Sequence, residues 1–120
     1  LAGLGLCVRG LGDYYSGGYQ FTDFPAECDN HTALTLTHDP AAAFQPGIEG
    51  LVLAGHTHCG QVSLPFIGAP WAPSSAPSEA HCGLYSDATR QVLVTPGIGT
   101  SVLPVRLGTQ AQWELMTVYR

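Results

Sequence analysis

Two histidines one residue apart, His56 and His58, follow a short apolar run in the segment LVLAGHTHCGQVSLP at residues 51–65. Neutral imidazole binds divalent metal ions without adding charge, and residues two apart lie on the same side of an extended backbone. Their Cα atoms are then about 6.6 Å apart, so each imidazole can bind one of two ions about 3.5–4 Å apart. The pattern favours a metal site over two polar loop residues.

One strand is expected just before these two histidines, and another just before a third histidine, His38. The segment TALTLT at 32–37 alternates apolar and polar residues, and the apolar run at 51–54 is typical of a strand buried on both faces. The connection over 39–50 begins with Asp39, a good N-cap, and Pro40, which suits a first helical turn. Its length is about the minimum that joins two parallel neighbours through a short helix.

Parallel strands would place the histidines at one edge of the sheet. His38 follows the first strand and His56 follows the second, so both lie at carboxyl ends, where open parallel sheets bind their ligands. With an extended backbone through His58, all three imidazoles can converge. We therefore predict His38, His56 and His58 as metal ligands.

Composition limits the classes of protein to which the chain can belong. It has 120 residues, of which 45% are hydrophobic and 11% charged, and its net charge of -5 argues against a nucleic-acid-binding surface. No apolar run approaches the ~18 residues of a membrane span, so we expect no membrane segment in this chain. Further strands are expected at 1–8, 91–95 and 113–119, which makes residues 1–120 a single β-rich α/β unit.

The four cysteines, Cys7, Cys28, Cys59 and Cys82, are spread singly along the chain without a CxxC pair. They can form two disulfides, but disulfide-stabilised domains are usually shorter and denser in cysteine. We therefore favour free thiols in a reducing compartment.

Several motifs together resemble the calcineurin-like metallophosphoesterases, of the YkuE/YaeI-type bacterial branch. The resemblance is carried mainly by LTHDP at 36–40 and GHTHCGQ at 55–61, with support from HCGLY at 81–85, TPGIGTSVLPVR at 95–106 and WEL at 113–115. It is in register from Thr32 onward, and weaker before that. The Asp-x-His, Gly-Asp-x-x-Asp and Gly-Asn-His motifs of the family's first half are absent, so the resemblance implies the C-terminal half only.

This resemblance implies a fold, a set of ligands and an activity. The expected fold class is α/β, the β-rich C-terminal half of a metallophosphoesterase α/β sandwich with a mixed sheet and few short helices. His38 and His56 would share one ion and His58 would bind the second. The parent protein is then a phosphomonoesterase or phosphodiesterase with two divalent metal ions (Mn, Fe or Zn). Its catalytic histidine is expected in the absent N-terminal half, and the isolated chain should be inactive.

Other interpretations remain open at this stage. The three histidines can instead hold a single zinc in a non-catalytic module, with Cys59 or water as the fourth ligand. Cys59, where the family more usually has glycine, is a tolerated variant, a soft ligand or a redox-sensitive position. The chain is expected to form a homo-oligomer or to pair with its own missing N-terminal half. A cytoplasmic location is expected, with membrane association through an absent N-terminal segment as the alternative.

Four residues near these motifs receive weaker assignments. Asp13, in a Gly/Tyr-rich loop, is favoured as a turn residue rather than a ligand. His31 lies about 23 Å from His38 along a strand, too far to share a site. Trp71 is favoured as a residue that covers apolar surface rather than as part of the wall of a substrate groove. Arg106 is left open between a phosphate contact and an ion pair.

Overall fold

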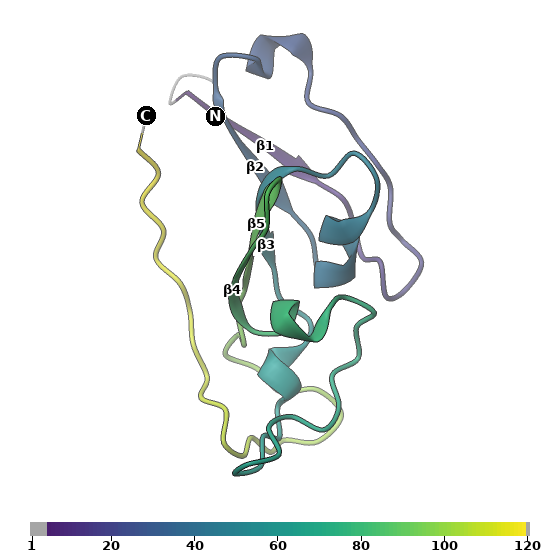
Figure 1. The fold of residues 1–120 in the computed structure, drawn as a ribbon, viewed down its shortest axis with the longest axis vertical. Helices are drawn as coiled ribbons and strands as arrows, with labels where there is room; N and C mark the ends of the chain where they lie inside the picture. Colours follow the sequence, from purple (N-terminus) through teal and green to yellow (C-terminus); the bar gives the residue numbers. More distant parts are fainter. Residues whose placement is uncertain (1–4, 120) are drawn as a thin grey trace.

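The computed structural model describes residues 5–119, which form one five-stranded sheet in the order β1-β2-β3-β5-β4 (Figure 1). The strands are β1 (Leu6–Gly10), β2 (Thr32–Leu36), β3 (Gly50–Ala54), β4 (Gly83–Ser86) and β5 (Arg90–Val94). Four short 3-10 helices connect them: η2 (Ala26–Cys28), η3 (Pro40–Phe44), η4 (His58–Gly60) and η5 (Ser78–Ala80). Four strands run parallel and the edge strand β4 pairs antiparallel with β5. The expected fold class, a β-rich mixed sheet with few short helices, is confirmed.

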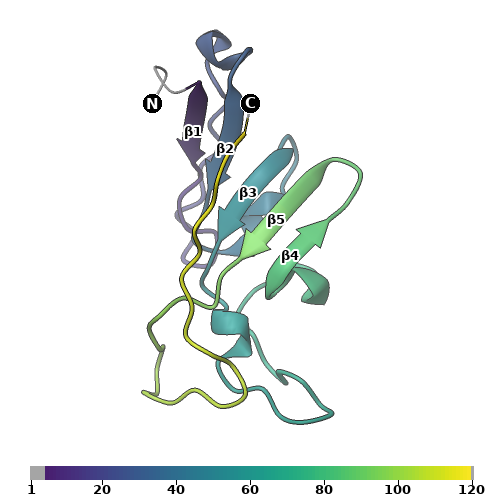
Figure 2. The ribbon, with the colours of Figure 1, turned by 90° about the vertical axis from the view of Figure 1, so that its left-hand side faces the viewer.

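Three of the expected strands lie within one residue of their predicted bounds, namely those at 32–37, 51–54 and 91–95. The strand expected at 1–8 begins at Leu6 and ends at Gly10, and residues 1–4 lie outside the described part of the chain. The strand expected at 113–119 is wrong, because this segment has no hydrogen-bonded strand partner in the described residues. It passes in front of the sheet instead (Figure 2). Alternation indicates an extended backbone, but a strand also needs a neighbour with which to pair.

The core lies between one face of the sheet and the connection from β2 to β3. Asp39 begins η3 as predicted, since its carboxylate accepts a hydrogen bond from the Ala41 amide at 3.0 Å. Three alanines of η3 are buried against the sheet, and their small side chains let this turn approach β3 and β5 closely. The buried cluster consists of Leu11, Ala42, Ala43, Ile48, Val52, Ala54, Val92 and Val94.

The opposite face of the sheet is rich in leucine and only partly covered. On β2, Thr35 is 1% exposed and accepts a hydrogen bond from the buried Arg9 guanidinium, while its neighbour Leu36 is 42% exposed. The strand register aligns eight apolar residues on this side, which we call the leucine face: Leu6, Val8, Leu34, Leu36, Leu51, Leu53, Leu84 and Leu93. The segment 108–119 runs along this side (Figures 1 and 2), and a cavity of about 470 Å³ separates part of it from Leu53 and Leu93.

Two disulfides cross-link the chain, so the expectation of free thiols is wrong. Cys7 of β1 is bonded to Cys28 of η2, with Cα atoms 5.9 Å apart, and Cys59 of η4 is bonded to Cys82, with Cα atoms 4.7 Å apart. Cysteine spacing does not determine pairing, because the fold decides which Cα atoms come within about 4.4–6.8 Å. In residues 5–119, no helix is long and apolar enough to cross a membrane.

Candidate metal centre

His38 and His56 meet where β2 and β3 end. The two strands are parallel neighbours, as predicted, and their pairing continues past the last strand residues through the hydrogen bond from the Gly55 amide to the His38 carbonyl at 3.0 Å. This register places Nε2 of His38 only 3.0 Å from Nδ1 of His56. Both imidazoles therefore present a ring nitrogen to the same point at the carboxyl edge of the sheet.

The ring of His56 is held in one orientation by its surroundings. Its Nε2 lies 2.7 Å from the carbonyl oxygen of Pro73, which can only accept a hydrogen bond. The proton of neutral His56 therefore resides on Nε2, and Nδ1 keeps the lone pair that faces His38. The Tyr15 ring packs on the imidazole with centroids 4.6 Å apart. Histidines that bind metals commonly donate their other ring N–H to a carbonyl in this way.

His58 is not part of this pair, because the backbone after His56 is not extended. His56, His58 and Cys59 have φ values of 64°, 50° and 54°, in the left-handed region that L-residues seldom adopt. The extended spacing that we expected from the sequence is therefore wrong. The chain makes a tight turn that includes η4, and this turn separates the two imidazoles of the GHTH motif.

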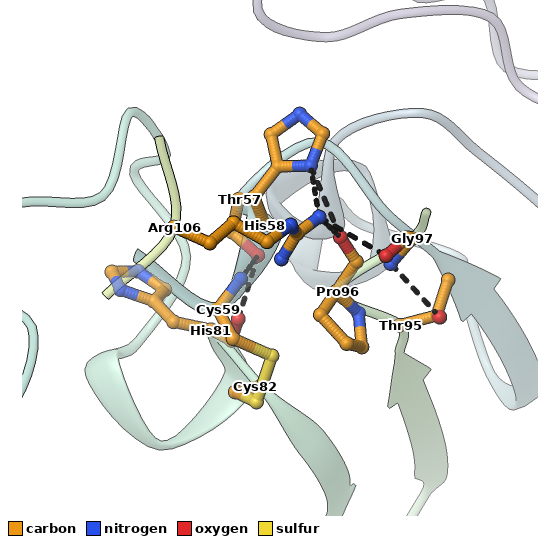
Figure 3. Close-up of a disulfide and its surroundings, with 9 residues drawn as sticks. All are labelled: Thr57, His58, Cys59, His81, Cys82, Thr95, Pro96, Gly97 and Arg106. Atoms are coloured by element: carbon orange, nitrogen blue, oxygen red, sulfur yellow. Dashed lines mark hydrogen bonds between the residues drawn. A yellow bond between two sulfur atoms is a disulfide. The ribbon is translucent and has the colours of Figure 1, made fainter. Parts of the chain in front are cut away.

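Two cross-links stabilise this turn, and sequence reasoning missed both. The buried hydroxyl of Thr57 donates to the His81 carbonyl at 2.7 Å, and it also accepts from the Cys59 amide at 3.3 Å. Two residues after Thr57 and one residue after His81, Cys59 is bonded to Cys82 (Figure 3). The only signal in the sequence was the similar order of the two segments, HTHC and HC, each with a histidine just before its cysteine.

The His58 ring extends away from the disulfide toward the loop that follows β5 (Figure 3). Its Nδ1 lies 3.0 Å from the Pro96 carbonyl and 3.3 Å from the Arg106 guanidinium. A proton on Nδ1, which the carbonyl stabilises, leaves Nε2 as the nitrogen with a lone pair. Arg106 donates to the carbonyls of Pro96 and Gly97, so it stabilises this loop, and within residues 5–119 it forms no ion pair.

The nearby carboxylates are occupied by local hydrogen bonds. Asp39 is buried and accepts from Ser74 Oγ as well as from the Ala41 amide. Asp13 accepts from the amides of Tyr15 and Ser16 at 3.1 and 3.2 Å, as expected of a turn residue. A hydrogen bond from the Ser16 side chain, with smaller contributions from the Tyr15 amide and the charge of His38, holds the pKa of Asp13 below its ordinary 3.8, against the opposing effect of burial.

The histidine pair does not by itself form a complete metal site. In residues 5–119, no three His, Cys, Asp or Glu side chains come together as a cluster that could hold an ion. The disulfide also decides the role of Cys59, which has no thiolate to offer a zinc ion. The suggestion that Cys59 completes a single-zinc site is therefore wrong.

Comparison with known proteins identifies relatives but no matching family model and no matching solved structure. The chain is 34% identical over 109 residues to phosphodiesterase YaeI of Escherichia coli, which corresponds to 89% of this chain and 39% of that protein. It is 30% identical over 92 residues to the uncharacterized metallophosphoesterase YkuE of Bacillus subtilis, covering 75% of this chain and 32% of the relative. A transmembrane protein with metallophosphoesterase domain from Bos taurus is 30% identical over 89% of this chain and 26% of its own length. The chain therefore spans less than half the length of each of these relatives.

Proposed function

Because the chain is homologous to metallophosphoesterases over most of its length, we propose that its parent protein hydrolyses phosphomonoesters or phosphodiesters with two divalent metal ions. Residues 1–120 then form part of a single phosphoesterase domain, and this part supplies histidine ligands. The observation that carries the proposal is the approach of His38 Nε2 to His56 Nδ1, at 3.0 Å.

The spacing of these two nitrogens fits a shared ion. Ligands about 2.05 Å from an ion and at right angles to one another are about 2.9 Å apart, which is close to the observed separation. The lone pair on Nδ1 of His56 is already directed at this point, because its other nitrogen is bonded to the Pro73 carbonyl. His38 needs only to move its proton from Nε2 to Nδ1. Further ligands must come from the rest of the parent protein or from water.

His58 is proposed as the ligand of the second ion. Its Nε2 is the nitrogen left with a lone pair when Nδ1 donates to Pro96, and the cross-linked turn fixes the ring relative to His56. Divalent ions held by these histidines would supply polarisation of the phosphoryl oxygens and a water molecule of lowered pKa as the nucleophile. The three histidines would hold the two ions and fix their position, and the catalytic histidine is expected outside this chain. Mixed nitrogen and oxygen ligation suits Mn, Fe or Zn.

The disulfides favour a location different from the one first expected. Disulfides persist in oxidising compartments and are rare in the reducing cytosol. Two of them, with no free cysteine in the described residues, favour an extracytoplasmic position for this chain over a cytoplasmic one. Attachment to a membrane through a segment outside this chain is compatible with that position. Free-thiol titration of the parent protein in intact and lysed cells tests this assignment.

Metal titration of the chain with variants tests the proposed ligands. Calorimetry with Mn²⁺ or Zn²⁺ should show about one ion bound, because two cations about 4 Å apart repel strongly without a bridging carboxylate. His38→Ala and His56→Ala should each abolish this binding, whereas His31→Ala, a matched control that lies before β2, should leave it unchanged. In the parent protein, His56→Ala or His58→Ala should lower the hydrolysis of bis-p-nitrophenyl phosphate by orders of magnitude. Binding that survives in both His38→Ala and His56→Ala would refute the ligand assignment.

A further inference from the structure

A second cavity lies directly beside the histidines, with a volume of about 340 Å³. Its walls come from the GHTHCGQ turn, the proline-rich loop after it and the loop that follows β5. These segments contribute His56, His58, Val62, Trp71, Val102 and Leu103, with Pro70 and Pro73 among the remaining wall residues. The carbonyl of Pro73 that orients His56 belongs to this wall, so the cavity and the proposed metal site share structural elements.

The walls are mostly apolar and carry no formal charge. The sequence has no Asp, Glu, Lys or Arg between Gly50 and Ser78, nor between Gln91 and Val105, and these two stretches supply all of the wall residues. The Gln61 side chain is already occupied. Its amide nitrogen donates to the carbonyls of Ser101 and Leu103 at 3.1 and 2.9 Å, and its oxygen accepts from the Ser101 amide at 2.7 Å. Gln61 thus joins two walls and leaves no amide group for a polar ligand.

Apolar side chains at this site remain accessible, in contrast to what the sequence suggested for Trp71. Trp71 is 68% exposed and Val102 is 96% exposed, so neither covers a core. Val102 also has a φ of 65°, a conformation that is a genuine outlier for a β-branched residue. Such outliers persist where the surrounding structure enforces them, and they concentrate at functional sites. Here the hydrogen bonds of Gln61 to Ser101 and Leu103, on either side of Val102, hold the loop in this conformation.

The geometry points to a binding site for an apolar substituent of the phosphoester, a cyclic alkyl or aryl group whose phosphoryl end reaches the histidines. This inference rests on the proposed function for its phosphoryl end, but the apolar end binds independently of metal. A cavity of about 150 Å³ accepts a benzene ring, so 340 Å³ accommodates a ring together with part of its ester linkage. Sugar, polyol or charged substituents would leave their polar groups without partners on these walls.

The test uses Trp71 as an internal reporter. The chain has two tryptophans, and Trp113→Phe removes the other one, which lines the cavity under the segment 108–119. Cyclohexyl phosphate, cyclohexanol and methyl phosphate, none of which absorbs in the indole band, are titrated in the absence of metal while Trp71 emission is recorded. Saturable changes with both cyclohexyl compounds, and a much weaker response to methyl phosphate, are expected.

A matched pair of variants locates the binding site. Val102→Asn replaces an apolar wall with a neutral amide that tolerates a positive φ, so it should fold normally and weaken cyclohexyl phosphate binding about tenfold. Ile98→Asn changes the same loop at a position that is 76% exposed but outside this cavity, and should leave binding unchanged. Equal responses to methyl and cyclohexyl phosphate, or equal effects of the two variants, overturn the inference. Loss of metal binding with cyclohexanol binding intact would contradict the proposed function and leave this site standing.

Discussion

Replacing the Cys59–Cys82 disulfide should weaken metal binding much more than its effect on overall stability would suggest. The perturbation is the double substitution Cys59→Ser with Cys82→Ser. The second disulfide supplies the comparison, because Cys7→Ser with Cys28→Ser removes a cross-link of nearly the same length between β1 and η2, on the far side of β2 from β3.

The two disulfides should contribute almost equally to the free energy of unfolding. Their cysteines are 23 and 21 residues apart in sequence. The chain-entropy relation then gives about 3.4 kcal/mol for Cys59–Cys82 and about 3.3 kcal/mol for Cys7–Cys28 at 25 °C. Either loss is a large fraction of the roughly 5–15 kcal/mol that stabilises a typical domain. The difference of about 0.1 kcal/mol is too small to measure, so the variants are matched in stability.

Their effects on the site should differ, because only one disulfide stabilises the left-handed turn. His56, His58 and Cys59 each adopt a conformation that costs about 1–2 kcal/mol for an L-residue. Without Cys59–Cys82, the strained turn keeps only hydrogen bonds to other segments, such as those from Thr57 to His81 and between His56 and the Pro73 carbonyl, and has no covalent cross-link. The turn should then relax toward ordinary backbone angles and move the His56 ring away from His38. A loss of about 10–100-fold in metal affinity is expected, as for other groups that orient a ligand.

The assay combines urea denaturation, which checks that the stabilities match, with calorimetric titration of Mn²⁺ or Zn²⁺ below the urea transition. The affinity for the metal ion should fall in the Cys59→Ser/Cys82→Ser variant. In the Cys7→Ser/Cys28→Ser variant it should stay within about twofold of the affinity of the unsubstituted chain, a difference of about 0.4 kcal/mol. Equal losses in the two variants would show that general loosening, and not the turn, controls the site. No loss in either would refute the claim that the disulfide positions His56.

Three further predictions follow from other contacts. Thr57→Val should destabilise the chain by about 1–3 kcal/mol in urea denaturation, because it leaves the partly buried His81 carbonyl without its donor; a cost no greater than that of Thr109→Val, on the exposed C-terminal segment, would contradict this. The Thr89 amide, with the Arg90 amide, the Thr89 hydroxyl and the Arg90 charge, holds the pKa of Asp87 below 3.8 against the opposing effect of burial. Its stabilisation is therefore present above pH 3.8 and is lost as the pH falls through the lowered value. Asp87→Asn should flatten the dependence of thermal stability on pH in this range, and an unchanged profile would refute the assignment. The leucine face, with Leu84 62% exposed, should make the isolated chain self-associate, and Leu84→Lys should favour the monomer in light scattering. An unsubstituted chain that is monomeric at roughly tens of micromolar would contradict this.

The sequence predicted the sheet better than it predicted the turn at its edge. The strands β2, β3 and β5 were predictable because runs such as TALTLT and LVLA carry their own pattern of burial, and the glycine at each end of the second run marks its limits. The meeting of His38 and His56 followed from the same reasoning, since parallel pairing places the residues after both strands at one edge. These features depend on local pattern and on a general rule of topology.

The features that were missed depend on contacts between distant segments. The two-residue spacing of the GHTH motif predicts an extended backbone, since L-residues seldom adopt left-handed angles. The disulfide to Cys82 and the bond from Thr57 to His81 override that preference. The four-residue strand β4 has too short a pattern to recognise, and it forms because Asp87 closes a tight connection to β5. Cysteine pairing likewise depends on where the backbone brings the Cα atoms together, which single spacings do not reveal.

The long uncharged stretches around the site have a consequence for ionic strength. Residues 50–78 and 91–105 contain no formal charge, and in the described residues Arg106 is the guanidinium that contacts a site histidine. Interactions between exposed charges weaken as salt screens them over about 8–10 Å, but ligand bonds to neutral imidazoles and contacts with apolar walls involve no such charges. Binding at the two proposed sites is therefore expected to be nearly independent of salt, with selectivity that depends on ligand geometry and cavity shape.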